Sequence, residues 1–171
     1  MKIVLALLAL AATAWPQAAG DVNARYRTPE SRSEMAKLLG SSNRDKTQKP
    51  EVVVAARGLK PGMTVADIGT GAGYMLPYLS RAVGASGRVL AEDVQQDFLD
   101  HAKAKIDTEK LANVSVFLGG FTDPKLPVGA VDVEMVLDVY HHFDEPAKML
   151  AALAAPLKPG GHLVIVEYHK G

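Results

Sequence analysis

The residues best suited to chemistry lie in a short glycine-rich stretch, Val65–Tyr74, with the sequence VADIGTGAGY. Its glycines stand at every second position, at Gly69, Gly71 and Gly73, and an acid, Asp67, stands two residues before the first of them. Glycines spaced in this way let the backbone turn tightly and let a ligand approach main-chain N–H groups without a Cβ in the way. The stretch therefore predicts a buried strand, a ligand-binding turn and a helix whose N-terminus faces the ligand.

The acid and the glycine spacing narrow the kind of ligand. Dinucleotide-binding turns hold a pyrophosphate on the spacing G-x-G-x-x-G, and an acid at the position of Asp67 would repel that phosphate. This chain has the spacing G-x-G-x-G. Both features disfavour an NAD(P) oxidoreductase and favour a ligand with a cationic or hydrogen-bond-donating group. A tight turn with no ligand is the purely structural alternative.

Polar residues also stand where two later strands are expected to end. Asp93 closes the second strand, where an acid can accept hydrogen bonds from both ribose hydroxyls of an adenosine group. Its neighbour Glu92 should face the other way, because side chains alternate across a strand. In the alternative reading, both acids only cap the helix that follows.

The fourth strand is expected to end in the sequence LDVYHHF. Tyr140 or His141 could orient a substrate or take its proton, since histidine titrates near neutral pH. In the alternative reading, the two histidines only pack and cap a helix that begins near Asp144. A metal site would pair them with Asp138 or His169, but no regular ligand spacing supports one, and we predict no metal.

Strands and helices alternate along the chain in the way that is typical of a parallel sheet. The expected strands are 65–68, 88–94, 114–118, 131–139 and 162–168, and the expected helices are 29–39, 50–57, 73–83, 95–111 and 144–157. Residues 21–28 are predicted to be extended, and 41–48 and 121–129 to be loops. The fold class is therefore α/β, with its ligand beyond the carboxyl ends of the strands.

In order and spacing, these segments resemble class I S-adenosylmethionine (SAM)-dependent methyltransferases, over roughly residues 44–168. The Asp67 turn resembles the first motif of that family, the sequence VLAEDV that contains Asp93 resembles its second, and LKPGG before the fifth strand is also similar. Residues 44–50, RDKTQKP, resemble a leader that lies over the cofactor mouth in a bacterial subset. The resemblance implies a Rossmann-like, doubly wound sheet in the order 3-2-1-4-5, with SAM as the cofactor.

The resemblance also implies which residues hold the cofactor. Asp93 would take the ribose, Val94 would lie against the adenine, and Asp138 would approach the methionine part. The other expected contacts are with Asp67, Gly69, Thr70, Gly71, Gly73 and Gly120. Many members carry an acid near Gly120 that contacts the adenine amino group; here backbone groups alone, or Asp123, would replace it.

The function implied is methyl transfer from SAM to a small molecule, with His141 and Tyr140 as candidate catalytic residues. A sulfonium makes its methyl carbon electrophilic, so the enzyme mainly has to align the acceptor and exclude water. An alternative from a different class is a non-catalytic module that binds SAM or a nucleotide.

Composition and the two ends of the sequence limit which partners and which cellular compartment we expect. The formal net charge is zero and cysteine is absent, which disfavours nucleic acid and excludes disulfides and thiolate metal sites. Residues 1–19 combine Lys2, an apolar run and small residues, which is typical of a signal peptide; a buried N-terminal helix is the alternative. We therefore expect export to the periplasm or beyond, a helical and loop segment over 20–48, and a SAM-binding domain over 49–171.

The expected domain stops early by comparison with the family, whose members usually continue with a helix and two more strands, one of them antiparallel. The chain ends at Gly171, so we expect those strands to be absent and the family domain to be incomplete here. The apolar fifth strand would then be a bare sheet edge. The explanations are an incomplete sequence, a partner or second copy that covers the edge, or a naturally minimal domain. No membrane contact is expected beyond export.

Overall fold

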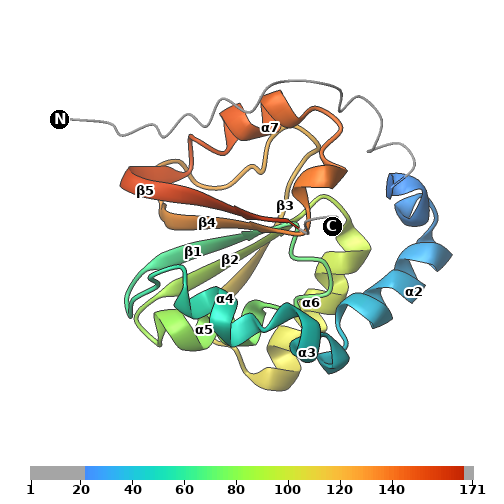
Figure 1. The fold of residues 1–171 in the computed structure, drawn as a ribbon, viewed down its shortest axis with the longest axis horizontal. Coiled ribbons are helices and arrows are strands. Elements are labelled where there is room, and N and C mark those ends of the chain that lie inside the picture. The colour runs from blue at the N-terminus through green and yellow to red at the C-terminus, as the bar shows by residue number, and fades with distance from the viewer. Residues whose placement is uncertain (1–21, 168–171) are drawn as a thin grey trace.

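One parallel sheet of five strands forms the centre of the computed structural model, which describes residues 22–167 (Figure 1). The strands are β1 (Thr64–Ile68), β2 (Arg88–Asp93), β3 (Val114–Leu118), β4 (Val131–Leu137) and β5 (Leu157–Val166). Their order is β3-β2-β1-β4-β5, and all four neighbouring pairs are parallel. The predicted α/β class and strand order are therefore confirmed.

Helices lie on both faces of the sheet and beyond the carboxyl ends of its strands (Figure 1). The helices on one face are α4 (Pro50–Ala55), α5 (Leu76–Val83) and α6 (Gln96–Glu109), and the helix on the other is α7 (Pro146–Ala152). The elements beyond the carboxyl ends are α2 (Pro29–Leu39), α3 (Asp45–Gln48) and the 3₁₀ helices η1 (Asn23–Tyr26), η2 (Ser42–Arg44) and η3 (Tyr140–His142). None of the helices within residues 22–167 is long and apolar enough to cross a membrane, and the predicted signal peptide, 1–19, lies outside the described residues.

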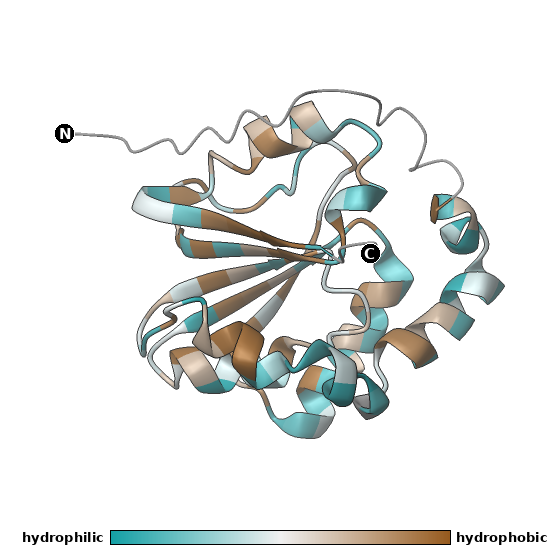
Figure 2. Ribbon diagram, in the orientation of Figure 1, coloured by the Kyte–Doolittle hydropathy of each residue, from teal (hydrophilic) through white to brown (hydrophobic). Residues whose placement is uncertain are grey.

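The core follows from strands that are apolar on both faces, as expected for a sheet that is covered on both sides. Figure 2 shows the hydrophobic strands sandwiched between the two helical layers. On the α5 face, the buried side chains include Val65, Leu76, Leu79, Val83, Val89 and Met135. On the α7 face, they include Ile68, Leu90, Val131, Val136, Met149 and Leu153.

One buried carboxyl interrupts this core. Glu134, in the middle of β4, is completely buried, and neither of its carboxyl oxygens has a hydrogen-bond partner among the described residues. Alternation along the strand places it on the same face as Val136, toward α7. Burial raises the pKa of this carboxyl to about 7.

The structure corrects several expectations about the N-terminal segment. Residues 41–48, predicted to be a loop, form η2 and α3, and residues 23–26, predicted to be extended, form η1. Lys49 adopts a left-handed conformation with φ of 46°, which ends α3 and lets α4 begin at Pro50. Two short helices thus replace one irregular stretch.

The region between β4 and β5 also differs from the prediction. Helix α7 begins at Pro146 with Glu145 as its N-cap, so Asp144 does not cap it. It ends at Ala152, because the chain then turns back and the carbonyl oxygens of residues 155 and 156 accept hydrogen bonds from the backbone of residues 129–131. This pairing starts β5 at 157, five residues before the predicted start at 162, with a register shift between Val131 and Val133.

Candidate functional site

A cavity of about 910 Å³ opens beyond the carboxyl ends of β1, β2 and β4. The glycine turn after β1 forms its floor, and the N-terminal segment, from Val22 to Arg44, supplies its outer wall. The predicted site residues that line it are Asp67, Gly69, Thr70, Gly71, Asp93, Val94, Asp138 and His141. This is the place where an open parallel sheet binds its ligands.

The backbone of the turn explains why Gly69, Gly71 and Gly73 carry no side chains. Gly69, Gly71 and Gly73 have φ of 67°, 55° and 79°, a region that other residues rarely adopt. A Cβ at Gly69 would lie 2.6 Å from Cγ1 of Val139, and one at Gly73 would lie 2.8 Å from Cδ1 of Leu76. Gly73 is not among the residues that line the cavity, so packing against the following helix is what requires it.

Asp67 is the acid at the floor of the cavity. It is 3% exposed, and its Oδ2 accepts a hydrogen bond of 2.7 Å from the hydroxyl of Thr70. Burial raises the pKa of Asp67 to about 7, and the Thr70 hydrogen bond offsets only part of that effect. A cationic ligand group beside this carboxyl would favour its ionised form, so the floor suits a positive charge.

Asp93 stands where a ribose acid is expected. It is 6% exposed, and its two carboxyl oxygens accept backbone hydrogen bonds of 2.9 Å, one from Gly71 and one from Gln95. Burial raises its pKa to about 6 in spite of these hydrogen bonds. Each oxygen retains a second acceptor position, so the carboxylate can also receive two hydroxyl groups from a ligand.

Glu92 turns beneath the glycine loop. Its Oε2 accepts a hydrogen bond of 3.3 Å from the backbone of Gly69, while Oε1 has no partner among residues 22–167. Burial raises the pKa of Glu92 to about 8. Gly119, which follows β3, leaves the room for this side chain, because a Cβ there would lie 1.7 Å from Oε1.

Gly119→Ala is therefore expected to lower the free energy of unfolding by about 1 to 3 kcal/mol, a typical cost of overpacking. Urea unfolding would measure it, and the double variant Gly119→Ala with Glu92→Ala should recover much of the loss. Gly120→Ala is the matched control, since the nearest atom to a Cβ there is 3.5 Å away. A Gly119→Ala protein as stable as the control would contradict the contact.

Asp123 does not contribute to the cavity wall beside Val94, where the resemblance places the adenine. That residue is exposed, it does not line the cavity, and its Oδ1 accepts a hydrogen bond of 2.8 Å from the backbone of Lys125. The residues that line the cavity here include Val94, Phe98 and Phe121. Gly120, which was predicted to contact the cofactor, also lies outside the lining.

The ends of β4 and β5 bring a second group of polar side chains together. Asp138 directly follows β4 with φ of 56°, and its backbone N–H donates a hydrogen bond of 2.8 Å to Val166 on β5. Nδ1 of His141 lies 2.8 Å from Oε2 of Glu167 and 3.9 Å from Oδ1 of Asp138. Glu167 was not predicted from the sequence; its place directly after a strand that neighbours β4 is the signal that could have found it.

His142 is held by hydrogen bonds to Asn23, and Tyr140 is held by packing. Oδ1 of Asn23 lies 2.7 Å from Nδ1 of His142, and the Asn23 amide donates a hydrogen bond of 3.0 Å to the backbone carbonyl of residue 142. Burial lowers the pKa of His142 to about 4, so the ring is neutral at pH 7. Tyr140 does not line the cavity; it packs on the α7 side of the sheet, edge-on to Phe143 with ring centroids 5.7 Å apart.

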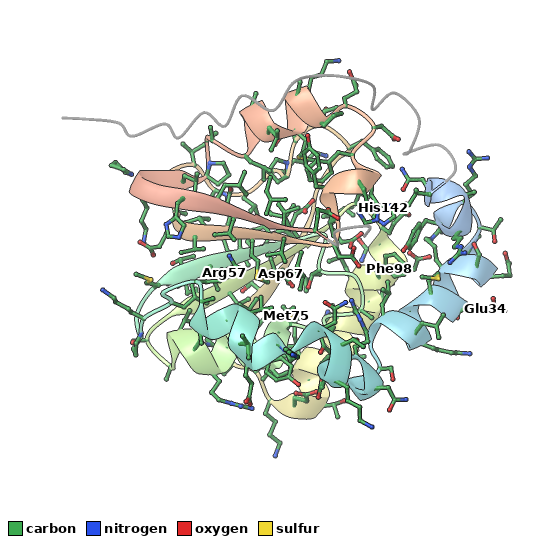
Figure 3. The ribbon with its side chains drawn as sticks, viewed as in Figure 1. Glu34, Arg57, Asp67, Met75, Phe98 and His142 are labelled. Carbon is green, nitrogen blue, oxygen red and sulfur yellow. The ribbon has the colours of Figure 1, made fainter. Side chains whose placement is uncertain are left out.

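Aromatic contacts join the N-terminal segment to α6 and η3. The ring of Tyr26 meets His142 and Phe98 edge-on, with centroids 5.1 and 5.8 Å away. Figure 3 shows Phe98 and His142 on the side of the molecule where the N-terminal helices lie. The outer wall of the cavity thus has its own apolar attachment, together with Met35 and Leu39 of α2.

Arg44 is the one residue of the RDKTQKP segment, 44–50, that lines the cavity. Asp45 accepts hydrogen bonds from the hydroxyls of Tyr74 at 2.7 Å and Tyr78 at 3.0 Å. Arg44 lines the cavity, and its guanidinium stands over the Tyr74 ring, 4.5 Å from the centroid. Its Nη1 donates a hydrogen bond of 2.7 Å to the carbonyl of Leu39. This segment therefore adds a positive charge to a cavity that is lined by several carboxyl groups and by the arginines at 25, 27 and 32.

The prediction that the protein binds no metal concerned the histidines that follow β4. Within residues 22–167, Asp138, His141 and Glu167 form one group of side chains whose potential ligand atoms all lie within 4.8 Å of one another. His169, the other residue weighed for a metal, lies outside the described residues. The contact between His141 and Glu167 is a hydrogen bond that needs no ion, and the absence of a metal stays a prediction.

Comparisons with known proteins agree with this geometry. A family model described as a methyltransferase domain matches residues 66–165, more than half of the chain. The crystal structure of a SAM-dependent methyltransferase from Aquifex aeolicus is 38% identical and superimposes with a TM-score of 0.75, over 81% of this chain and 76% of that one.

Curated relatives are longer proteins. An uncharacterized 37.1 kDa protein in transposon Tn4556 of Streptomyces fradiae is 36% identical over 116 residues, which are 68% of this chain and 33% of the relative. A ubiquinone/menaquinone biosynthesis C-methyltransferase of Vibrio vulnificus is 28% identical over 114 residues, 66% of this chain and 44% of the relative. The chain thus spans less than half the length of these two relatives. The family match, the Aquifex structure and the acid-bearing glycine turn together show that the chain belongs to the class I SAM-dependent methyltransferases.

Proposed function

We propose that this chain transfers the methyl group of SAM to a small-molecule acceptor. The observation that best supports the proposal is that one cavity joins the acid-bearing glycine turn to His141 at the end of β4. A cofactor held by the turn and an acceptor held beside the histidine would share that space. SAM, when bound, supplies a methyl group made electrophilic by the sulfonium.

The residues at the turn fit the parts of SAM. The free acceptor positions of Asp93 suit the ribose hydroxyls, and the buried carboxyl of Asp67 suits the cationic amino group. The apolar wall that contains Val94 and Phe98 suits the adenine ring. The main work of the chain is then to align the acceptor and to exclude water.

Hydroquinones are the first acceptors to try. The curated relatives include several ubiquinone/menaquinone biosynthesis C-methyltransferases, each 27–29% identical to this chain. Aromatic residues that line the cavity away from the adenine wall, Tyr26 and Phe143, would accommodate a flat aromatic acceptor.

The test is methyl transfer from SAM labelled in its methyl group to a panel of water-soluble hydroquinones, phenols and amines. Formation of S-adenosylhomocysteine (SAH) together with a labelled product would support the proposal, and Asp93→Ala is the control for cofactor-dependent turnover. Tight binding of SAH with no turnover of any acceptor would favour the non-catalytic binding module. Failure to bind SAH would contradict both.

Two further expectations accompany this proposal. Export rests on the pattern of residues 1–19, and detection of the mature protein in the periplasmic fraction of expressing cells would test it. The edge strand β5 exposes Ile165, which is 41% exposed, and a partner or a second copy would cover it. Sedimentation of the purified chain would reveal the second copy.

Arg44→Ala is expected to weaken SAH binding by about 10- to 100-fold, the usual effect of losing a hydrogen bond to a charged group. Arg44 is the cavity cation whose charge reaches both Asp67 and Asp138, so it is placed to receive the carboxylate of the amino-acid part. Calorimetry with SAH measures the change. Arg81→Ala is the matched control, because Arg81 also stands over a tyrosine ring but its side chain is 71% exposed. Equal SAH affinity in the two variants would place the carboxylate elsewhere.

A further inference from the structure

Glu167 makes two contacts with one residue, His141. Its Oε1 accepts a hydrogen bond of 3.3 Å from the backbone N–H of His141, and its Oε2 lies 2.8 Å from Nδ1 of the ring. The two contacts fix both the position of the backbone and the orientation of the imidazole. Glu167 itself is not among the residues that line the cavity, whereas His141 is.

The contact also fixes which ring nitrogen carries the proton. A carboxylate only accepts hydrogen bonds, so Nδ1 must donate, and Nε2 of the neutral ring is left with a free lone pair. The other charged groups near the ring are Asp138, 3.9 Å from Nδ1, and Arg44, whose charge acts on Asp138. His142, with its ring centroid 4.1 Å from that of His141, is neutral at pH 7. The charged groups nearest to the ring are therefore the two carboxylates.

We propose that Glu167 is a positioning residue that holds His141 as a general base, with Nε2 free to take a proton from the acceptor. The proposal rests on the proposed methyltransferase function and deepens it, because it names the class of acceptor. The acceptor must lose a proton when it is methylated, as a hydroquinone, a phenol or an acidic C–H compound does. A thioether, which has no proton to lose, would gain nothing from this pair.

The step balances without any further reactant. Methyl transfer breaks the S–CH₃ bond of the cofactor, forms a bond from that carbon to an oxygen or carbon of the acceptor, and releases SAH. The proton lost by the acceptor goes to Nε2 of His141, and the Glu167 carboxylate stabilises the imidazolium that results. A positioned general base of this kind contributes about 100- to 10,000-fold to a rate.

The test uses Glu167→Gln in the full chain. The backbone N–H of His141 requires an acceptor, so the amide oxygen is expected to face it and the amide NH₂ to face Nδ1. That group donates, so it reverses the tautomer and places the proton on Nε2, as happens when an amide replaces the acid of a catalytic triad. Glu145→Gln is the control, since Glu145 is an exposed acid that pairs with Lys148 outside the cavity.

Long-range ¹H–¹⁵N NMR of the imidazole rings reads the tautomer directly, with His141→Gln to assign the signal. We expect His141 to carry its proton on Nδ1 in the wild type and in Glu167→Gln to carry it on Nε2. SAH affinity, measured by calorimetry, should stay within about twofold. A wild-type ring protonated on Nε2, or an unchanged ring in Glu167→Gln, would overturn the proposal.

Two further measurements distinguish this proposal from a failure of the methyltransferase function and from a metal ion bound to His141. If the wild type binds no SAH, the methyltransferase function fails, while the tautomer result still decides the role of Glu167. If the chelator EDTA shifts the His141 signals and added Zn²⁺ or Mg²⁺ restores them, a cation bound to the ring replaces the hydrogen bond and overturns the proposal. With a hydroquinone that the wild type methylates, Glu167→Gln should lower kcat about 100-fold or more with KM nearly unchanged, and Glu145→Gln should leave both unchanged.

Discussion

Asp93→Ala is expected to weaken SAH binding by at least about 100-fold. The Asp93 carboxylate lines the cavity at the end of β2, and each hydrogen bond that it makes to a ribose hydroxyl is worth about 1.5 to 3 kcal/mol. Two such bonds lost together correspond to about 3 to 6 kcal/mol, or more than 100-fold in affinity. Calorimetric titration of SAH into wild type and variant measures the change.

The substitution also removes the partner of two backbone N–H groups, so its effect on folding must be separated from its effect on binding. Asp93→Asn keeps one acceptor for the turn and removes the charge, and it should still bind SAH at least about tenfold more weakly than the wild type. Asp100→Ala is the control, since Asp100 is an exposed acid on α6. If Asp93→Asn is folded and binds SAH as tightly as Asp100→Ala, Asp93 is not the ribose ligand.

Glu134→Met is expected to stabilise the protein, and to do so more at pH 8 than at pH 5. The pKa of Glu134 is raised by burial from 4.5 in the unfolded chain to about 7. The folded form therefore binds a proton more tightly, and the free energy of unfolding falls as the pH rises from about 4.5 through 7. A shift of this size corresponds to about 3 kcal/mol, which the methionine variant regains in full only above pH 7. Urea unfolding at the two pH values would measure the difference.

Asp132, on the same strand, provides a control with the opposite sign. Burial opposes its ionisation, but hydrogen bonds from Lys158 at 2.6 Å and from the backbone of Thr64 at 2.7 Å outweigh burial and hold its pKa below the usual value. Asp132→Asn should therefore destabilise the protein at pH 8 and have less effect at acid pH. The other buried acids, Asp67, Glu92 and Asp93, are present in every variant compared, so their titration cancels. A stability gap between Glu134→Met and wild type that does not change with pH would contradict the assignment.

The sequence was sufficient to predict the strands and the floor of the site, and the resemblance to a known family implied the order of the strands. Apolar runs bounded by glycine and proline mark β1, β2 and β3 to within one residue. The segment between the glycine turn and Asp93 contains one helix and one strand, so the turn and Asp93 lie at the same edge of the sheet. The apolar runs are local patterns. The proximity of the glycine turn and Asp93 follows from the parallel arrangement of the strands.

The contacts that could not be predicted join residues far apart in the chain. Asn23 and His142 are separated by 119 residues, and no periodicity indicates that they meet. Glu167 reaches His141 only because β5 lies beside β4. The sequence prediction of Tyr140 as a catalytic candidate rested on its place at the strand end, and its side chain turns to the α7 side instead. Whether a residue beyond a strand end faces the cavity depends on the local turn, which here is the 3₁₀ helix η3.

The N-terminal wall of the cavity has a thermodynamic consequence. Polar contacts that hold residues 22–48 to the rest of the domain include Arg32 with Asp97, Asp45 with the two tyrosines, and Asn23 with His142. Because the same residues bound the ligand space, any compound that touches both the wall and the floor links its own affinity to the docking of this segment. A bound cofactor should therefore slow proteolysis at arginines 25 and 27. The reciprocal also holds: each substitution that loosens the wall should weaken the affinity for the cofactor.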